Sequence, residues 1–104
     1  MILDHAVPPV RAGDQQESEA AFATARRLLA GAAGFRWLPL PRRLERGTGY
    51  LLLVEWNSVE DHTDGFRGSA AHQEWTTLLH HFSDPFPVVE HYATVLTADS
   101  QEDL

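Results

Sequence analysis

Hydrophobic residues alternate with polar ones, or run uninterrupted, in four stretches that predict β-strands. These stretches are residues 1–10, 35–42, 50–56 and 88–96. Between them, apolar residues three and four positions apart predict a helix over about residues 14–31 and a helix pair over about 58–66 and 69–83. The order strand, helix, strand, strand, helix pair, strand is typical of a ferredoxin-like α+β fold, βαββααβ. Its four-stranded antiparallel sheet has the order 4-1-3-2.

Prolines and small polar residues mark where these elements should end. Pro8 and Pro9 remove two successive N–H donors, so pairing of the first strand should stop near Val7. Pro39 and Pro41 present their missing donors to the same side of the second strand, which therefore belongs at a sheet edge. The expected helix N-caps are Asp14, Ser58 and Ser69.

The predicted central strand, residues 50–56, is apolar on both faces. Leu51 and Leu53 point to one side, and the opposite side carries Tyr50, Leu52, Val54 and Trp56. The helices of one chain can cover only one face of the sheet. The economical cover for the other face is a second copy, stacked sheet to sheet about a two-fold axis, so we predict a homodimer.

Composition excludes several classes of function. The 104 residues, 43% hydrophobic and 22% charged, suit one compact soluble domain. The absence of cysteine and lysine excludes disulfides, thiol nucleophiles, cysteine metal sites and Schiff bases. A formal net charge of −7 opposes binding to a phosphate backbone, so no nucleic acid is expected as a partner. No apolar run could span a bilayer and no signal-like start is present, so we expect no membrane partner and a cytoplasmic location.

The last residues differ in composition from the rest of the chain. Residues 98–104 carry Asp99, Glu102 and Asp103 and no basic or aromatic residue. Such a segment is typical of a solvated tail. We therefore predict one domain over residues 1–97, followed by an acidic flexible tail over 98–104.

Three segments make the chain resemble a known family. They read YLLLVEW at residues 50–56, GFRGS at 65–69 followed by Glu74 and Trp75, and DPFP at 84–87 running into VEHY at 89–92. Across residues 1–97 the chain resembles the antibiotic biosynthesis monooxygenases, small proteins that form dimeric α+β barrels. The resemblance implies that fold, but this scaffold hosts oxygenases, haem-degrading enzymes, isomerases and members without a known substrate.

The haem-degrading branch can be compared residue by residue. Its members resemble this chain around the helix pair, where they have a tryptophan followed ten residues later by a histidine, and they have an asparagine on the first strand. Here Phe66 and Thr76 stand at those two positions, and no asparagine lies near His5. The histidine that serves as the branch's axial iron ligand is therefore missing, and we expect no haem. His72 or His80 could bind the iron if the alignment were shifted along the chain.

The cofactor-independent oxygenase branch requires less of the protein. As the resemblance implies, an electron-rich phenol or enol is deprotonated and its anion passes an electron to dioxygen. The protein supplies a dry pocket, a proton acceptor and hydrogen bonds to a small aromatic or quinol-type substrate. We therefore expect a monooxygenase-like protein without a cofactor. The alternatives are a non-catalytic dimeric barrel that binds a small molecule or a protein partner, and an isomerase on the same scaffold.

Histidine is the natural candidate for the proton acceptor, because its ordinary pKa lies near neutrality. His5 and His91 each follow a carboxylate and lie on the first and last strands, which are neighbours in the expected order. If the register places them opposite each other, both imidazoles share one face of the sheet. They are the candidate catalytic residues; the alternative is a pair of hydrogen-bonded histidines at a dimer rim.

The candidate substrate-binding residues are mostly aromatic side chains and histidines near the expected cleft. They are Trp56, His62, Phe66, His72, Trp75 and Arg36. His72 and Trp75 share a helical face, although such tryptophans commonly belong to the core. Arg36 and Arg67 could bind a carboxylate or phenolate. No two histidines have metal-ligand spacing within a helix and no nucleophile elbow is present, so we expect neither a metal site nor a serine nucleophile.

Overall fold

The computed structural model describes residues 1–83 and 87–100, and its elements follow the predicted order. They are β1 (Ile2–Ala6), α1 (Gln15–Ala30), β2 (Phe35–Trp37), β3 (Leu52–Trp56), η1 (Asp61–Phe66), α2 (Ala70–Leu79), η2 (His80–Phe82) and β4 (Glu90–Ala93). The strands of this described part form a four-stranded antiparallel sheet in the order β2-β3-β1-β4. This is the predicted order read from the opposite edge, so the ferredoxin-like α+β fold is confirmed.

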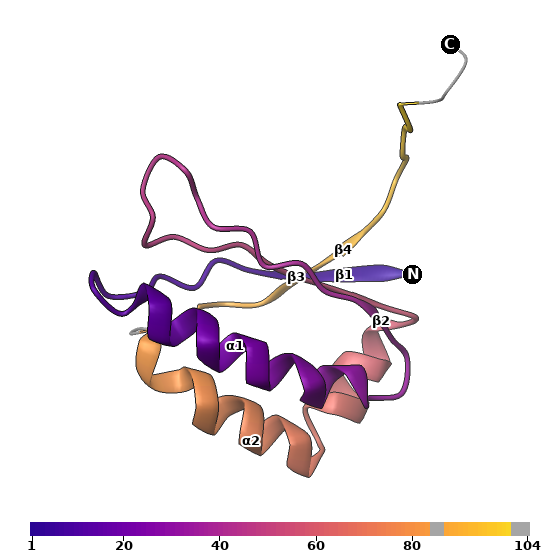
Figure 1. The fold of residues 1–104 in the computed structure, drawn as a ribbon. Coiled ribbons are helices and arrows are strands. Elements are labelled where there is room, and N and C mark those ends of the chain that lie inside the picture. Colours follow the sequence, from indigo (N-terminus) through magenta and orange to yellow (C-terminus); the bar gives the residue numbers. More distant parts are fainter. Residues whose placement is uncertain (84–86, 101–104) are drawn as a thin grey trace.

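The sheet has one covered and one uncovered face. Helices α1 and α2 pack on each other and lie on the same side of the sheet (Figure 1). We call the covered side the inner face; the strands present to it Asp4, Ala6, Val54 and Trp56, all of which are buried. We call the other side the outer face; the register places on it Leu3, His5, Leu53, Glu55 and Tyr92. None of the described helices covers that face.

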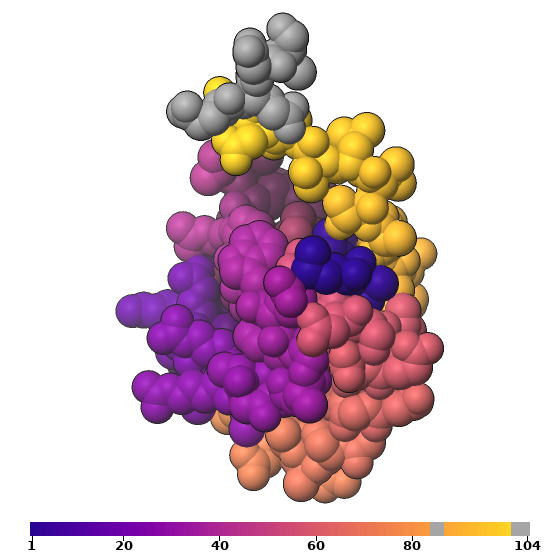
Figure 2. All heavy atoms as spheres, turned by 90° about the vertical axis from the view of Figure 1, so that its right-hand side faces the viewer, coloured from indigo at the N-terminus to yellow at the C-terminus, as the bar shows by residue number. Residues whose placement is uncertain are grey.

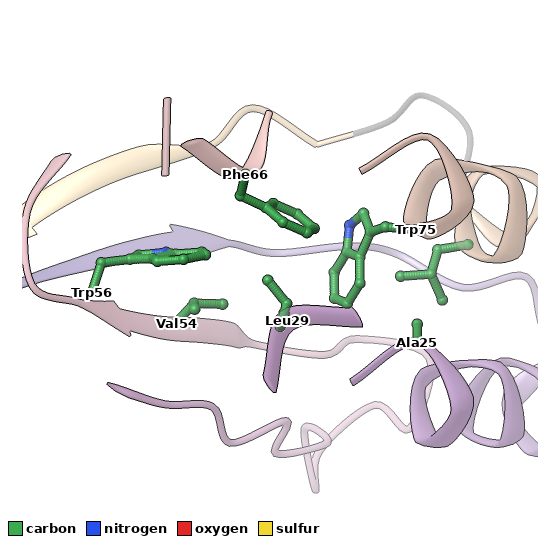
Figure 3. Close-up of a cluster of buried hydrophobic side chains, with 7 residues drawn as sticks. Ala25, Leu29, Val54, Trp56, Phe66 and Trp75 are labelled. Atoms are coloured by element: carbon green, nitrogen blue, oxygen red, sulfur yellow. The ribbon is translucent and has the colours of Figure 1, made fainter. Parts of the chain in front are cut away.

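The hydrophobic core lies between the inner face and the helices. Figure 3 shows side chains from the sheet, η1 and both helices facing one another there, namely Ala25, Leu29, Val54, Trp56, Phe66 and Trp75. Trp56 is completely buried, and its ring makes edge or tilted contacts with Phe35 and Phe66. Burying a large apolar side chain contributes about 1.5–3 kcal/mol each, so this cluster is a main source of stability.

The second strand is shorter than predicted, for a reason visible in the sequence. Pro39 and Pro41 cannot donate to a sheet ladder, so β2 ends before them instead of continuing through residues 35–42. Their carbonyls still accept hydrogen bonds from the N–H groups of Leu53, at 3.5 Å, and Leu51, at 3.0 Å. β2 lies at the edge of the sheet, as the two prolines predict.

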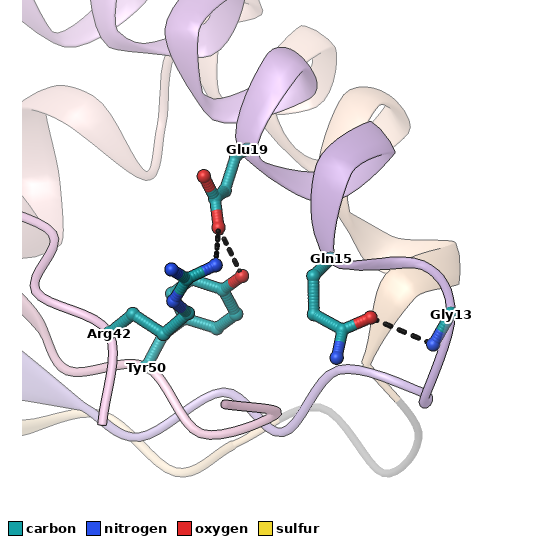
Figure 4. A network of polar contacts seen from close by, with 5 residues as sticks. All are labelled: Gly13, Gln15, Glu19, Arg42 and Tyr50. Atoms are coloured by element: carbon teal, nitrogen blue, oxygen red, sulfur yellow. Dashed lines mark hydrogen bonds and ion pairs between the residues drawn. The ribbon is translucent and has the colours of Figure 1, made fainter. Parts of the chain in front are cut away.

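The helix caps agree with the prediction in two of three cases. The hydroxyl oxygens of Ser58 and Ser69 accept the backbone N–H three residues on, at 3.2 and 3.3 Å. Asp14 occupies the N-cap position of α1, but its side chain makes no capping hydrogen bond. The side-chain oxygen of Gln15 instead accepts the N–H of Gly13 at 2.7 Å (Figure 4).

A polar contact ties the long connection before β3 to the first helix. The Tyr50 hydroxyl donates to Glu19 at 2.6 Å, and the Arg42 guanidinium donates to the same carboxylate oxygen at 3.1 Å (Figure 4). The pKa of Tyr50 is raised by burial and by the adjacent Glu19 carboxylate. This contact holds one end of the helical layer against the sheet.

The chain after β4 leaves the body of the domain. β4 covers four residues rather than 88–96, and the segment that follows runs away from the helices (Figures 1 and 2). Residues 98–100 of the predicted tail are exposed, and residues 101–104 lie outside the described part, as do residues 84–86 of the DPFP motif. The division at residue 97 stays a prediction. In the part that the structure describes, no helix is long and apolar enough to cross a membrane; the cytoplasmic location stays a prediction.

Candidate active site

A cavity of about 290 Å³ lies between the inner face of the sheet and the two helices. Its apolar wall includes Phe22, Leu29, Leu52, Val54, Trp56, Phe66 and Trp75. The polar groups that line it include Asp4, His62, Arg67 and His72. Five of the predicted substrate-binding residues therefore lie around one cavity: Trp56, His62, Phe66, His72 and Trp75.

Three polar side chains form a chain that begins in this cavity. The indole Nε1 of Trp56 donates to Oδ2 of Asp4 at 2.7 Å, which holds the buried carboxylate in place. The same oxygen lies 3.6 Å from Nε2 of His62. On the other side of its ring, His62 Nδ1 lies 2.8 Å from Nε2 of His91, within hydrogen-bond distance. Asp4, His62 and His91, which we call the inner triad, thus lie in a row.

The first turn of the helix pair is wound so that His62 points into the core. η1 is a π-helix, in which the N–H of Arg67 bonds to the carbonyl of His62 at 3.0 Å. Such wider turns are frequent at functional sites. η1 can approach the start of β2 closely because Gly34 has a φ of +81° and no side chain; a Cβ there would overlap the Asp61 carboxylate. His62 and Phe66, four residues apart, are consequently both buried.

Burial shifts the protonation of the groups around the cavity. It raises the pKa of the Asp4 carboxyl, although the hydrogen bond from Trp56 works in the opposite direction. It lowers the pKa of His62 to about 4, with smaller contributions from the positive charge of Arg67 and from His91 and His72. The pKa of His72 is likewise lowered by burial and by Arg67. Because a lowered pKa favours the neutral form, the His62 imidazole is uncharged at neutral pH, and the shift at His72 acts in the same direction.

The structure does not bring His5 and His91 together. β1 and β4 pair with Asp4 opposite His91 and His5 opposite Glu90, so the two histidines lie on opposite faces of the sheet. The expectation that they share a face is wrong, because a shift of one residue in register moves a side chain to the other side. His5 lies on the outer face, where its ring packs edge-on against Tyr92 at 5.3 Å.

Arg36 also lies away from the cavity. It is on β2, is exposed, and its Nε lies 3.2 Å from Oε1 of Glu55. A second guanidinium nitrogen donates to the side-chain oxygen of Asn57 at 3.1 Å. The expected role of Arg36 in substrate binding is therefore not supported by its position; Arg67 is the arginine that lines the cavity.

With the site in view, the chain can be compared with known proteins. Residues 1–78 match the antibiotic biosynthesis monooxygenase family. The chain belongs to this family. The resemblance that the sequence motifs indicated is thus confirmed.

Relatives of the family cover nearly the whole chain. The uncharacterized protein YczJ of Bacillus subtilis (strain 168) is 45% identical over 95 residues, which are 91% of this chain and 100% of YczJ. A crystal structure from Bordetella bronchiseptica, whose name places it provisionally in the same family, is 36% identical, covers 91% of this chain and 97% of its own, and has a TM-score of 0.86. SnoaB, a cofactor-independent oxygenase from Streptomyces nogalater, is 17% identical, with coverage of 97% and 98% and a TM-score of 0.71. At that identity the likeness to SnoaB shows the fold alone.

Asp4 is the site residue that the sequence reasoning missed as a candidate. A partial signal was present, because Asp4 stands between Ile2 and Ala6 on one side of the strand, although the alternation does not indicate which side is buried. Burying a carboxylate costs free energy unless the carboxylate is hydrogen-bonded, so a carboxylate on a buried strand face indicates a polar site around it. Within the described residues, no group of three or more histidine, aspartate or glutamate side chains is arranged to hold a metal ion.

Proposed function

We propose that this family member is a cofactor-independent monooxygenase that oxidises a small aromatic, quinol-type substrate in the inner-face cavity. The observation that carries the proposal is the inner triad, a buried carboxylate and two histidines in a row that starts at an aromatic cavity. An aromatic wall favours a flat, apolar ligand, and a chain of titratable groups suits the removal of its acidic proton.

The size of the cavity limits the substrate. Ligand pockets commonly span roughly 300–1,000 Å³. At about 290 Å³ this cavity lies at the lower end, which favours a compact ring system over an extended polycyclic one. The rings of Trp75 and Phe22 pack edge to face along its wall, with centroids 5.9 Å apart, and such aromatic walls offer surfaces for a flat ligand to pack on.

The proposed reaction needs no group besides the substrate and dioxygen. The inner triad accepts a proton from the substrate, and the resulting anion passes one electron to dioxygen to give a substrate radical and superoxide. These combine at carbon to form a peroxide, which takes up a proton. Loss of water then leaves a carbonyl, so that one oxygen atom enters the product and the other leaves as water.

Arg67 is suited to hold the anion formed in the first step. It lines the cavity next to Phe66, and among the described residues it takes part in no ion pair closer than 4.0 Å. Its positive charge acts on both His62 and His72. A phenolate or enolate oxygen at this position would be stabilised by the guanidinium.

The proposal includes a homodimer that covers the outer face. That face carries large apolar side chains in contact with water, including Trp37, which is 54% exposed, and Tyr92, which is 47% exposed. Leu53, at its centre on β3, is half-buried. A second sheet stacked on this face would remove these side chains from water and would leave the inner-face cavity of each subunit accessible to substrate.

An isomerase is the second candidate, because the inner triad could also take a proton from one carbon and return it to another. Oxygen uptake separates the two. Across a panel of hydroquinones and anthrones, we expect the protein to consume dioxygen with the single-ring hydroquinones, which suit the size of the cavity. The His91→Gln variant should be slower by on the order of 100-fold, since general base catalysis typically contributes 10²–10⁴-fold.

The His5→Gln variant is the matched control for this experiment. It removes a histidine from the neighbouring strand but on the face away from the cavity, so oxygen uptake should stay within about twofold of that of the unmodified protein. Equal losses in both variants would contradict the placement of the reaction. Substrate turnover without oxygen uptake would favour the isomerase.

A further inference from the structure

The inner triad has one end in the cavity and the other at the edge of the sheet. Asp4 and His62 both line the cavity, whereas His91 does not. His91 lies half-buried on β4, which is an edge strand, between the exposed side chains of Glu90 and Tyr92. The three side chains therefore connect the interior of the site with the surface of the subunit.

We infer that the inner triad is a proton path, in which Asp4 takes the proton from the bound substrate, His62 passes it on and His91 releases it to water. The inference rests on the proposed function for the identity of the proton donor. It assigns Asp4, rather than a histidine, as the group that meets the substrate.

The transfer can be written with every proton accounted for. Before it, protonated Asp4 faces the unprotonated Nε2 of His62 across 3.6 Å, and Nδ1–H of His62 donates to Nε2 of His91. The Asp4 proton then moves to Nε2 of His62 while the proton on Nδ1 moves to Nε2 of His91. Asp4 ends as a carboxylate, His62 stays neutral with its proton on the other nitrogen, and His91 becomes a cation that can lose its proton to solvent.

The surroundings of His62 suit a residue that passes a proton without keeping it. The residue is 7% exposed, and its ring stacks on Trp56, with centroids 5.5 Å apart and planes inclined by 23°. The positive charge of Arg67, which directly follows η1, acts on it, as do His72 of α2 and His91 of β4. Burial and the positive charge both disfavour a lasting imidazolium, so a proton that enters at one nitrogen leaves at the other.

The surroundings of Asp4 contain several cationic or potentially cationic groups. The carboxyl accepts the hydrogen bond from Trp56 of β3 and feels the charges of Arg67, His91 of β4 and His5 of its own strand. The 3.6 Å between its Oδ2 and Nε2 of His62 exceeds a hydrogen bond. A rotation of the carboxylate or a bridging water molecule therefore completes the path.

Nuclear magnetic resonance of the histidine ring nitrogens tests the path without any enzymatic assay. We expect a through-hydrogen-bond coupling between Nδ1 of His62 and Nε2 of His91. The isosteric Asp4→Asn variant, whose amide cannot take up the proton, should shift the ring-nitrogen signals of both His62 and His91. The His5→Gln variant should leave them unchanged. Absence of the coupling, or His91 signals that do not respond to Asp4→Asn, would overturn the inference.

A kinetic experiment distinguishes this inference from the proposed function. With an accepted substrate, His91→Ala should lower turnover by on the order of 100-fold, and added imidazole should restore it in a concentration-dependent way. A His91 with a structural role alone would not be replaced by a dissolved base, so failure of rescue would contradict the path. If no substrate consumes oxygen, the proposed function fails, whereas the nitrogen coupling and its response to Asp4→Asn still decide whether the path exists.

Discussion

The inner and outer faces of the sheet are built from the same strands and differ in almost every other respect. On β1, Asp4 and Ala6 are buried beneath the helices, while His5 between them faces away. On β3, Trp56 is completely buried, and Leu53 on the other face is half-buried. The inner face holds a cavity with titratable groups; the outer face holds apolar side chains with no described helix above them. Because side chains alternate along each strand, the residues of the proposed reaction lie on one face and those of the proposed dimer interface lie on the other.

The difference also separates what each face can tolerate. Polar groups on the inner face are held by specific hydrogen bonds, such as that from Trp56 to Asp4 at 2.7 Å. In the separate subunit, polar groups on the outer face lie near water and need no such partner. A substitution on the inner face should consequently affect stability and ligand binding, whereas one on the outer face should affect association between subunits.

The largest effect is expected for Trp56→Ala. Truncating this buried ring removes core contacts and the donor to Asp4, so the free energy of unfolding should fall by about 3–5 kcal/mol. Trp37→Ala is the matched control, because that ring is half exposed already. Measured by urea denaturation at a concentration where subunits are separate, it should cost less than about 1.5 kcal/mol. Similar losses in the two variants would remove the contrast between the faces.

Leu53→Asp should separate the subunits and leave each one folded. A carboxylate placed at the centre of the outer face would be buried in the dimer without a partner, which costs several kcal/mol. Sedimentation should show a dimer for the unmodified chain and a monomer for the variant, with unchanged helical circular dichroism. Leu44→Asp, at a position 93% exposed, is the control and should remain dimeric. A monomeric unmodified chain would contradict the homodimer.

His62→Gln should change how stability depends on pH. The unfolded chain protonates His62 near its usual pKa of about 6.5, while the folded protein does so only near a pKa of about 4. The unfolded state therefore binds more protons between these values, and stability is lost as the pH falls through this window. At about 1.4 kcal/mol for each pKa unit, the loss from this residue is on the order of 3 kcal/mol.

The variant lacks this loss, so its stability should approach that of the unmodified protein as the pH falls from 6.5 to 4. Asp4 provides a check of sign, because its raised pKa makes the folded state hold a proton more tightly. Asp4→Asn should therefore change the slope in the opposite direction. Parallel stability curves for His62→Gln and the unmodified protein would show that His62 is not buried as described.

The smallest effect is expected for Arg67→Gln. Removing the guanidinium removes a positive charge that disfavours protonation of His62 and His72, so the pKa of both should rise. Proton resonance titration of the imidazole rings would measure this. Arg36→Gln, which changes a residue outside the cavity, should leave both pKa values unchanged. An equal rise of these pKa values in the two variants would place Arg67 away from the site.

The division into faces could be predicted from the sequence, but the register between strands could not. The alternation along residues 1–7 places Asp4 and Ala6 on one side and His5 on the other, but it does not indicate which side the helices cover, and His5 was the residue expected at the site. Where β4 pairs with β1 depends on the chain after α2, whose course no periodicity determines. A shift of one residue was enough to move His91 opposite Asp4 and away from His5.

The local course of η1 could not be predicted either. The sequence predicts a helix near residues 58–66, but nothing in its apolar spacing indicates a π-turn rather than an α-turn. That turn and the close approach at Gly34 place His62 next to His91. By contrast, helical spacing places His72 and Trp75 on one face of their helix, and both line the cavity; their role in substrate binding stays a prediction.

The central claim is that ligand binding belongs to the inner face, and the three tryptophans of the chain test it directly. Trp56 and Trp75 line the cavity, whereas Trp37 is exposed outside it. In a nitrogen–proton correlation spectrum recorded during titration with a hydroquinone under nitrogen gas, the indole N–H signals of Trp56 and Trp75 should shift together and saturate, and that of Trp37 should stay in place. A shift confined to Trp37, or saturation without any change at Trp56 and Trp75, would contradict the account.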